Sequence, residues 1–270
     1  MTATCDILVV DDEPVITHAV DRVCGADAMS VDEADSAADA MARLAHCTYR
    51  LIICDVMMAD VNGFEFLAGL GRAGIRTPVI MSTGMSTMEN AVRALGAGAI
   101  DFIPKPFTAD ELLAAVRRGL HYVRLQDAAA AAAETAPERP DSLVWVPCPA
   151  KYYRLGYASW LETEHDGTVL IGVSDLFVKV IDPVLGVTLG AVGDEVMQGS
   201  VCATIRSRDD VEHGVLSPVS GRIVEVNGGL ASAPTVVERD PYFEGWLYRV
   251  LPSELQYDLQ HLTSCSSDRM

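Results

Sequence analysis

The chain has 270 residues, half of them apolar, and a formal net charge of −18. This length favours two domains of ordinary size over one. Acidic residues exceed basic ones in both halves, so neither half offers the basic surface that nucleic-acid binding requires, and we expect no nucleic-acid partner. No apolar run reaches the roughly 20 residues of a membrane helix, so we expect no membrane contact.

The amino terminus, MTATCDILVVDDEP, has no basic start and no small-residue cleavage site, which indicates a first strand and not a signal peptide. The seven cysteines are scattered and never form a C-x-x-C pair. Such a pattern is typical of a reducing compartment, where thiols serve as small buried hydrophobes. We therefore predict a cytoplasmic protein.

Residues 5–125 alternate short apolar strands with amphipathic helices, which predicts a first domain over residues 1–125. The expected helices include Ser36–Ala45 and Met88–Leu95, and the expected strands are Asp6–Val10, Met29–Glu33, Leu51–Cys54, Pro78–Met81 and Ala99–Ile103. Nearly continuous apolar strands are typical of a parallel sheet that is covered on both faces. The fold class predicted here is α/β, a doubly wound five-stranded parallel sheet.

Polar side chains follow four of these strands: Asp11 and Asp12, then Asp55, Thr83 and Lys105. Each alone is an ordinary loop or turn residue. Ligands of doubly wound sheets bind outside the carboxyl ends of the strands, and all five residues lie at such ends. The sequence therefore predicts one site.

The residue types at this site point to phosphoryl transfer. Three carboxylates in one place repel one another and need a divalent cation, and oxygen ligands suit Mg²⁺. The metal would neutralise an incoming phosphoryl group while Asp55 attacks it. Lys105 supplies a positive charge for the phosphoryl oxygens, and the Thr83 hydroxyl can donate a hydrogen bond to them.

The motifs VVDDEP, CDVMMADVNG, PVIMSTG and GAIDFIPKPF, with their spacing, resemble the receiver domain of bacterial two-component response regulators over residues 5–125. The resemblance implies that a histidine kinase donates a phosphoryl group to Asp55. It also implies Mg²⁺ held by Asp11 or Asp12, by Asp55 and by the backbone carbonyl of Met57.

The same resemblance implies a switch in which the Thr83 hydroxyl moves toward the phosphoryl group and the ring of Phe102 turns inward. Ordinary core packing is the alternative role of Phe102, and one ring can do both. The family usually has proline at the position of Ala59. Met57, two residues past the acceptor, is apolar and cannot orient a hydrolytic water, so we predict self-dephosphorylation over minutes or longer.

A long helix is expected after the first domain. Thr108 and Glu111 have the spacing of a capping box, and the pattern continues into the six alanines Ala128–Ala133. Prolines follow, so residues 126–142 are predicted to be a helical extension and a proline-containing linker. The apolar stripe of this helix packs on the sheet in its first turns and is also a candidate contact of a homodimer; it comprises Leu112, Val116, Leu120 and Val123.

From residue 143 onward, short β-rich runs separated by Gly, Asp and Pro predict an all-β sandwich or barrel. We expect this second domain to span 143–262, to end in a short helix capped by Ser253, and to be followed by a flexible tail over 263–270.

The second domain resembles the lipoyl-biotinyl carrier fold and, more closely, the H protein of the glycine cleavage system. The resemblance spans about Tyr153 to Leu255 and includes VGDEV, SPVSG and DPYFEGWLYRV. It implies a lipoyl-type barrel-sandwich fold with a lipoylated lysine at a hairpin tip ahead of SPVSG. Asp210 stands at that position, within about one residue, and no lysine follows Lys179. An amide-linked arm needs an amine, so we expect no lipoate here.

Two residues of this domain have alternative interpretations. Lys179, in DLFVKVID, falls on a different part of the H-protein fold and is expected to be a surface lysine. His213 lies beside Glu212 and Asp210, which allows a weak metal site, with a solvated loop as the simpler interpretation.

These features favour a signalling protein over an enzyme. Its own chemistry would be limited to self-phosphorylation and self-dephosphorylation at Asp55, and the second domain would bind an unknown output protein. One alternative is a carrier component of glycine or one-carbon metabolism under receiver control. Another is an indirect regulator of transcription.

Overall fold

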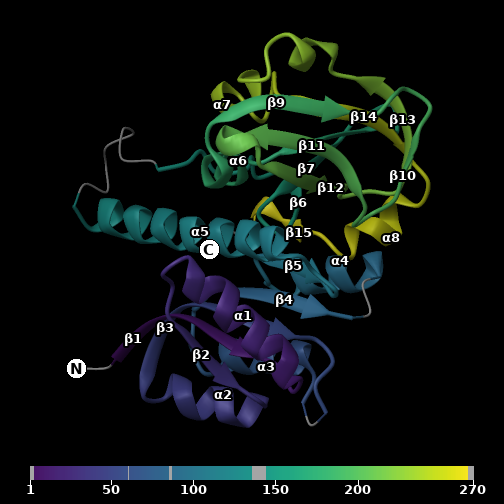
Figure 1. The fold of residues 1–270 in the computed structure, drawn as a ribbon. Coiled ribbons are helices and arrows are strands. Elements are labelled where there is room, and N and C mark those ends of the chain that lie inside the picture. Colours follow the sequence, from purple (N-terminus) through teal and green to yellow (C-terminus); the bar gives the residue numbers. More distant parts are fainter. Residues whose placement is uncertain (1–2, 60, 85–86, 136–143, 267–270) are drawn as a thin grey trace. The chain divides into compact units, whose positions relative to one another are not determined.

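The computed structural model describes residues 3–59, 61–84, 87–135 and 144–266 (Figure 1). The chain divides into two compact units, Met1–Arg124 and Leu125–Met270. Within the described ranges, no helix combines the length and the apolar character that a membrane crossing requires. The finer division into extension, linker and tail stays a prediction, since Pro137 and Pro140 lie outside the described residues.

The first unit is the predicted doubly wound sheet, with five parallel strands in the order β2-β1-β3-β4-β5. Its strands are β1 (Ala3–Val10), β2 (Val31–Ala34), β3 (Cys47–Asp55), β4 (Val79–Thr83) and β5 (Asp101–Pro104). Its helices are α1 (Pro14–Ala26), α2 (Ala37–Leu44), α3 (Gly63–Arg72), α4 (Met88–Gly96) and the first part of α5 (Ala109–Thr135), which continues past Arg124. Each predicted strand and helix overlaps an observed one.

Both faces of this sheet are covered by helices. One apolar cluster joins Ile52 and Met81 of the sheet to residues of α2, α3 and α4, such as Phe66. On the opposite face, α5 approaches so closely that a Cβ at Gly119 would lie 2.9 Å from the side chain of Leu51. Burial on two faces explains why the strands read as nearly continuous apolar runs.

Side-chain caps fix where the helices begin. Ser36, Asn62 and Thr87 accept hydrogen bonds from backbone N–H groups in the first turns of α2, α3 and α4. The predicted capping box of α5 is present: the Thr108 N–H donates to Glu111 Oε2 at 2.7 Å, and the Glu111 N–H donates to Thr108 Oγ1 at 3.2 Å. The helix then continues through the alanine run.

The apolar stripe of α5 packs in its first turns as expected. Leu112, Val116 and Leu120 are buried, whereas Val123 is only half-buried. A dimer contact through this stripe stays a prediction.

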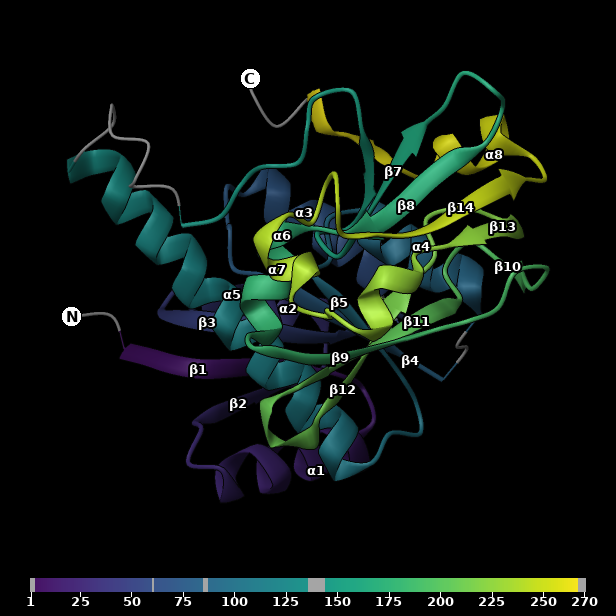
Figure 2. The same ribbon diagram turned by 90° about the horizontal axis from the view of Figure 1, so that it is seen from above.

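The second unit is an antiparallel β domain with two sheets, which can be followed in Figure 2. The larger sheet has the order β10-β13-β14-β8-β7-β6-β15, and the smaller has the order β12-β11-β9. The strands are β6 (Tyr153–Leu155), β7 (Ser159–Thr163), β8 (Val169–Val173), β9 (Val184–Leu189), β10 (Glu195–Val196), β11 (Val201–Ser207), β12 (Glu212–Leu216), β13 (Gly221–Val226), β14 (Trp246–Pro252) and β15 (Thr263–Ser264). Short helices connect them: α6 (Asp175–Ile181), α7 (Val236–Arg239) and α8 (Leu255–Leu259).

Buried tyrosine and tryptophan side chains hold this unit together. The Tyr248 hydroxyl of β14 donates to the Cys202 carbonyl of β11 at 2.8 Å and accepts from the Gly190 N–H at 2.7 Å, which links the two sheets. On the larger sheet, the buried ring of Trp160 lies over Gly172, where a Cβ would be 2.4 Å from the ring. An all-β sandwich was predicted, and the structure confirms it.

The end of the second unit corrects two expectations. Residues 263–265 are not a flexible tail: β15 pairs with β6, Cys265 is 1% exposed, and its N–H donates to the Tyr152 carbonyl at 3.0 Å. Backbone pairing with an edge strand decides this, and the polar composition gave no sign of it. Residues 267–270 lie outside the described residues. The terminal helix α8 starts after Glu254, with no side-chain cap.

Candidate functional site

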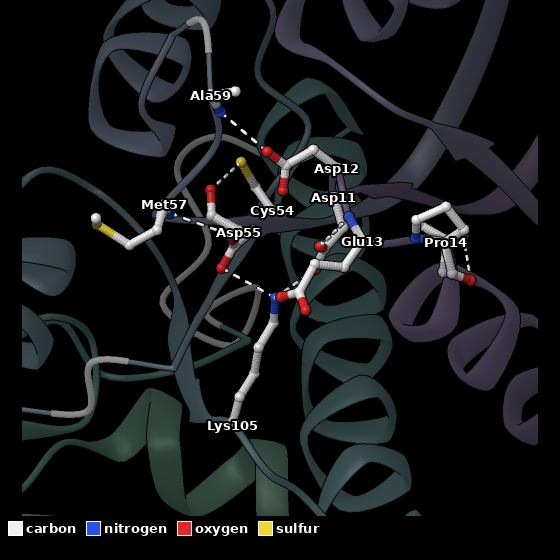
Figure 3. A network of polar contacts seen from close by, with 10 residues as sticks. Asp11, Asp12, Glu13, Pro14, Cys54, Asp55, Met57, Ala59 and Lys105 are labelled. Carbon is white, nitrogen blue, oxygen red and sulfur yellow. Dashed lines mark hydrogen bonds and ion pairs between the residues drawn. The ribbon is translucent and has the colours of Figure 1, made fainter.

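The predicted site residues of the first unit lie at one edge of the sheet. Asp11 follows β1, Asp55 and Thr83 end β3 and β4, and Lys105 follows β5. These four strands are adjacent and parallel, so their carboxyl ends meet at the same edge. Figure 3 shows Asp11, Asp55 and Lys105 pointing toward one another, with Asp12 beside them.

Lys105 is the centre of the charge network. Its Nζ lies 2.7 Å from Asp11 Oδ2 and 3.2 Å from Asp55 Oδ1, and all three side chains are at most 8% exposed. Burial raises the pKa of Asp11, against the hydrogen bond and charge of Lys105. Burial alone would lower the pKa of Lys105, but Asp11 and Asp55 outweigh it and raise that pKa. The lysine is therefore held as a cation inside the site.

The carboxylate of Asp55 is held in place, but its hydrogen-bonding capacity is not fully used. The Met57 N–H donates to Asp55 Oδ2 at 3.2 Å. Asp55 Oδ1 is buried and, among the described residues, accepts no well-aligned hydrogen bond, so its ion pair with Lys105 is its one close polar contact. The start of α3 packs closely against the backbone of this residue, because a Cβ at Gly63 would lie 2.3 Å from the Asp55 carbonyl oxygen. An under-coordinated buried oxygen is suited to a ligand.

The residues present fit a hard divalent cation. Asp11, Asp12 and Asp55 each offer a carboxylate oxygen, and these oxygens lie within 4.8 Å of one another. Asp12 is exposed and accepts from the Ala59 N–H at 3.0 Å. An acidic pocket built only of oxygen donors is of the kind that binds Mg²⁺. The Met57 side chain is 55% exposed and points away from the carboxylates in Figure 3, and the role of its carbonyl stays a prediction.

The two switch residues are near the site but differently placed. Thr83 is fully buried, and its carbonyl accepts from the Lys105 N–H at 2.8 Å. Phe102 is half-buried and packs against the apolar cluster of the sheet, which is the core role that the sequence left open. Its part in a switch stays a prediction.

Glu13 belongs to the network and was missed as a site residue. Its Oε1 lies 3.3 Å from Lys105 Nζ. The signal was present, because Glu13 directly follows Asp11 and Asp12 in the first motif. The sequence alone cannot distinguish a third acidic residue of the site from a solvent-exposed glutamate at the start of a helix.

The singled-out residues of the second unit do not form a chemical site. Asp210 lies at the tip of the β11–β12 hairpin, with φ +58°, a side chain that is 82% exposed, and an ion pair of 2.9 Å to Arg206. Lys179 lies on α6, a different element from that hairpin, and pairs with Asp175 at 3.1 Å.

The sequence was wrong about His213. This residue is 6% exposed and lies on β12, where its Nε2 is 2.9 Å from Ser207 Oγ, so it is not in a solvated loop. Within the described part of the chain, the cluster of potential metal ligands is the one in the first unit, which does not include His213. Strand alternation turned this side chain inward.

Comparison with known proteins assigns both units. The family model of the response regulator receiver domain matches residues 7–117, so the first unit is a receiver domain. The glycine cleavage H-protein model matches residues 151–268, so the second unit belongs to the H-protein family.

Individual relatives follow the same division. The probable glycine cleavage system H protein of Thermococcus kodakarensis is 39% identical over 103 residues, which cover 38% of this chain and 75% of that protein. The transcriptional regulatory protein TcrA of Mycobacterium tuberculosis is 36% identical over 111 residues, or 41% of this chain and 44% of TcrA. The crystal structure of the NtrX receiver domain from Brucella abortus is 34% identical, with a TM-score of 0.41, and the match covers 43% of this chain and 98% of that one.

Proposed function

We propose that Asp55 is the phosphoryl acceptor of this response regulator and that a histidine kinase is its donor. One observation carries the proposal: the buried Asp55 carboxylate has an oxygen that, among the described residues, is paired with Lys105 alone, 3.2 Å away, and it shares its sheet edge with two further carboxylates. Membership of the receiver family supports a kinase as the partner.

The residues divide the reaction between them. An Asp55 carboxylate oxygen attacks phosphorus while the bond from phosphorus to the donor nitrogen breaks, and the electron pair leaves with that nitrogen. The Lys105 ammonium neutralises charge on the transferred oxygens. Asp11, Asp12, Asp55 and the Met57 carbonyl would hold Mg²⁺, which supplies Lewis-acid stabilisation of the phosphoryl oxygens when bound. Thr83 donates a hydrogen bond to the phosphorylated side chain. The ring of Phe102 then turns inward as the Thr83 hydroxyl moves toward the phosphoryl group.

The second unit is a binding module that does not carry lipoate. The support is chemical: Asp210 occupies the hairpin tip, and the sequence has no lysine after Lys179. A carboxylate cannot form the amide that a lipoyl arm requires. The module would engage an output protein whose identity lies beyond this chain, since a fold does not name its partner.

Mass spectrometry tests the acceptor directly. The purified protein is incubated with acetyl phosphate and Mg²⁺, and the intact mass and the modified peptide are measured. We expect one phosphoryl increment, located at Asp55, and none in Asp55→Asn. An equal increment in Asp55→Asn, or none in the wild type, would overturn the proposal. Omitting Mg²⁺ should suppress the increment if the three carboxylates hold the metal.

A further inference from the structure

Glu13 lies at the solvent side of the phosphoryl-acceptor site. It is the N-cap residue of α1, and its own N–H donates to Asp11 Oδ1 at 3.1 Å, which anchors its backbone to the site. Its side chain is 63% exposed and makes no cap hydrogen bond to α1. The carboxylate instead reaches Lys105, with Oε1 3.3 Å from Nζ.

The Lys105 ammonium therefore contacts three carboxylates and has three hydrogens to offer them. Two of the carboxylates, Asp11 and Asp55, are buried and belong to the cluster that fits a metal ion. Glu13 is outside that cluster and exposed, so its charge stands where a phosphoryl donor must approach Lys105 from solvent.

We propose that Glu13 is a specificity-determining residue, whose carboxylate disfavours phosphoryl donors in proportion to their negative charge. This inference rests on the proposed function of Asp55. The donors that Glu13 favours are those whose leaving group carries positive charge beside the phosphoryl group, as a protonated nitrogen does. Small anionic acyl phosphates are the donors that it disfavours.

Two small donors separate this charge effect from everything else that Glu13 does. Acetyl phosphate is a dianion at neutral pH, whereas phosphoramidate carries a protonated nitrogen and a single net negative charge. In both, an Asp55 oxygen forms the new bond to phosphorus. The bond that breaks is phosphorus to oxygen in acetyl phosphate, which releases acetate, and phosphorus to nitrogen in phosphoramidate, which releases ammonia.

The size of the effect follows from Coulomb's law. One charge removed at the mouth of the site changes the approach of a dianion about twice as much, in free energy, as that of a monoanion. At low ionic strength and a surface-like dielectric constant, we expect Glu13→Gln to speed phosphorylation by about fivefold with acetyl phosphate and about twofold with phosphoramidate. Near molar salt, where the Debye length is about 3 Å, the charge effect should largely vanish.

The experiment measures rates of Asp55 phosphorylation by intact mass for the wild type, Glu13→Gln and Glu13→Ala, with both donors at low and high salt. Glutamine can still accept a hydrogen bond from Lys105 and alanine cannot, so agreement between the two variants assigns the effect to charge. The matched control is Asp21→Asn, an exposed α1 residue about 12 Å further along the helix, which makes the same change in net charge.

The expected result is a rise in the acetyl phosphate to phosphoramidate rate ratio for both Glu13 variants, lost at high salt and absent in Asp21→Asn. A ratio equal to that of the wild type overturns the inference and leaves the acceptor role of Asp55 intact. A wild type that reacts with neither donor overturns the proposed function itself. Circular dichroism of each variant confirms that the compared proteins are folded.

Discussion

The two units differ in how their charged side chains are arranged. In the first, the charged groups of the receiver site converge, with Lys105 Nζ within 3.2 Å of both Asp11 and Asp55. In the second, the two sheets and the hairpin of an H-type domain remain, but Asp210 stands at the hairpin tip. The comparison teaches that a buried core preserves a fold independently of the few side chains that give it chemistry.

The largest expected effect is the gain of a lipoylation site in the second unit. Asp210→Lys places an amine on an exposed hairpin tip, and we expect it to gain a lipoyl increment in intact mass after co-expression with a lipoate ligase. The wild type should gain none. Asp209→Lys covers a shift of one residue along the tip. A lipoylated wild type would end the contrast between the units, and it would revive the metabolic carrier as the function.

The next effect concerns the lifetime of the phosphorylated first unit. Met57 is 55% exposed beside Asp55 and cannot orient water, so the isolated phospho-protein should persist for minutes or longer. Met57→Glu supplies a carboxylate that can position a hydrolytic water, and we expect its phosphoryl group to be lost several-fold faster. Decay is followed by intact mass after removal of the donor. Loss from the wild type within seconds would contradict this reading of the site.

A third experiment asks whether the units are energetically separate. The side chain added in Gly172→Ala would meet the buried Trp160 ring at 2.4 Å, so we expect the second unit to lose about 1–3 kcal/mol of unfolding free energy. Urea denaturation followed by tryptophan fluorescence reports this unit alone, because all three tryptophans lie in it, at Trp145, Trp160 and Trp246.

The control for that experiment is Gly228→Ala, where the new Cβ meets nothing within 4 Å. Its unfolding free energy should match that of the wild type. Phosphorylation of Asp55 should be unchanged in both variants. If Gly172→Ala slowed phosphorylation, the second unit would be supporting the site in the first.

The smallest effect compares two buried acids. Burial raises the pKa of Asp11 at the site, and burial also raises the pKa of Asp258, which anchors the Ser220 N–H at 2.8 Å. A raised pKa means that the folded state binds the Asp258 proton more tightly than the unfolded state. This carboxylate therefore costs stability as pH rises through its folded pKa, and the cost is absent below the unfolded value of 3.8.

Asp258→Asn keeps an oxygen for Ser220 and removes the charge. The variant should be slightly more stable than the wild type at neutral pH, with a difference that shrinks toward zero near pH 3.8, measured by the same fluorescence assay across pH. A stability difference that is independent of pH would show that hydrogen bonding, and not charge, governs this position.

Local patterns predicted much of this fold. Apolar strands at β1 to β5 and the capping box of Thr108 and Glu111 were visible because periodicity and caps are properties of short segments. Contacts between distant segments were not visible. The pairing of β15 with β6 and the contact of Glu13 with Lys105 each depend on partners far along the chain. The burial of His213 depends on which face of β12 packs inward, and that too is decided by tertiary packing.

By itself, the sequence determined which residues stand at the ends of the parallel strands and that no amine follows Lys179, because order and residue type need no folding to be known. Only the tertiary structure decided that Asp55 keeps a buried oxygen paired with Lys105, and that Glu13 faces the same lysine from solvent. Distance and burial set the strength of charge interactions, and both exist only once the sheet has brought its edges together.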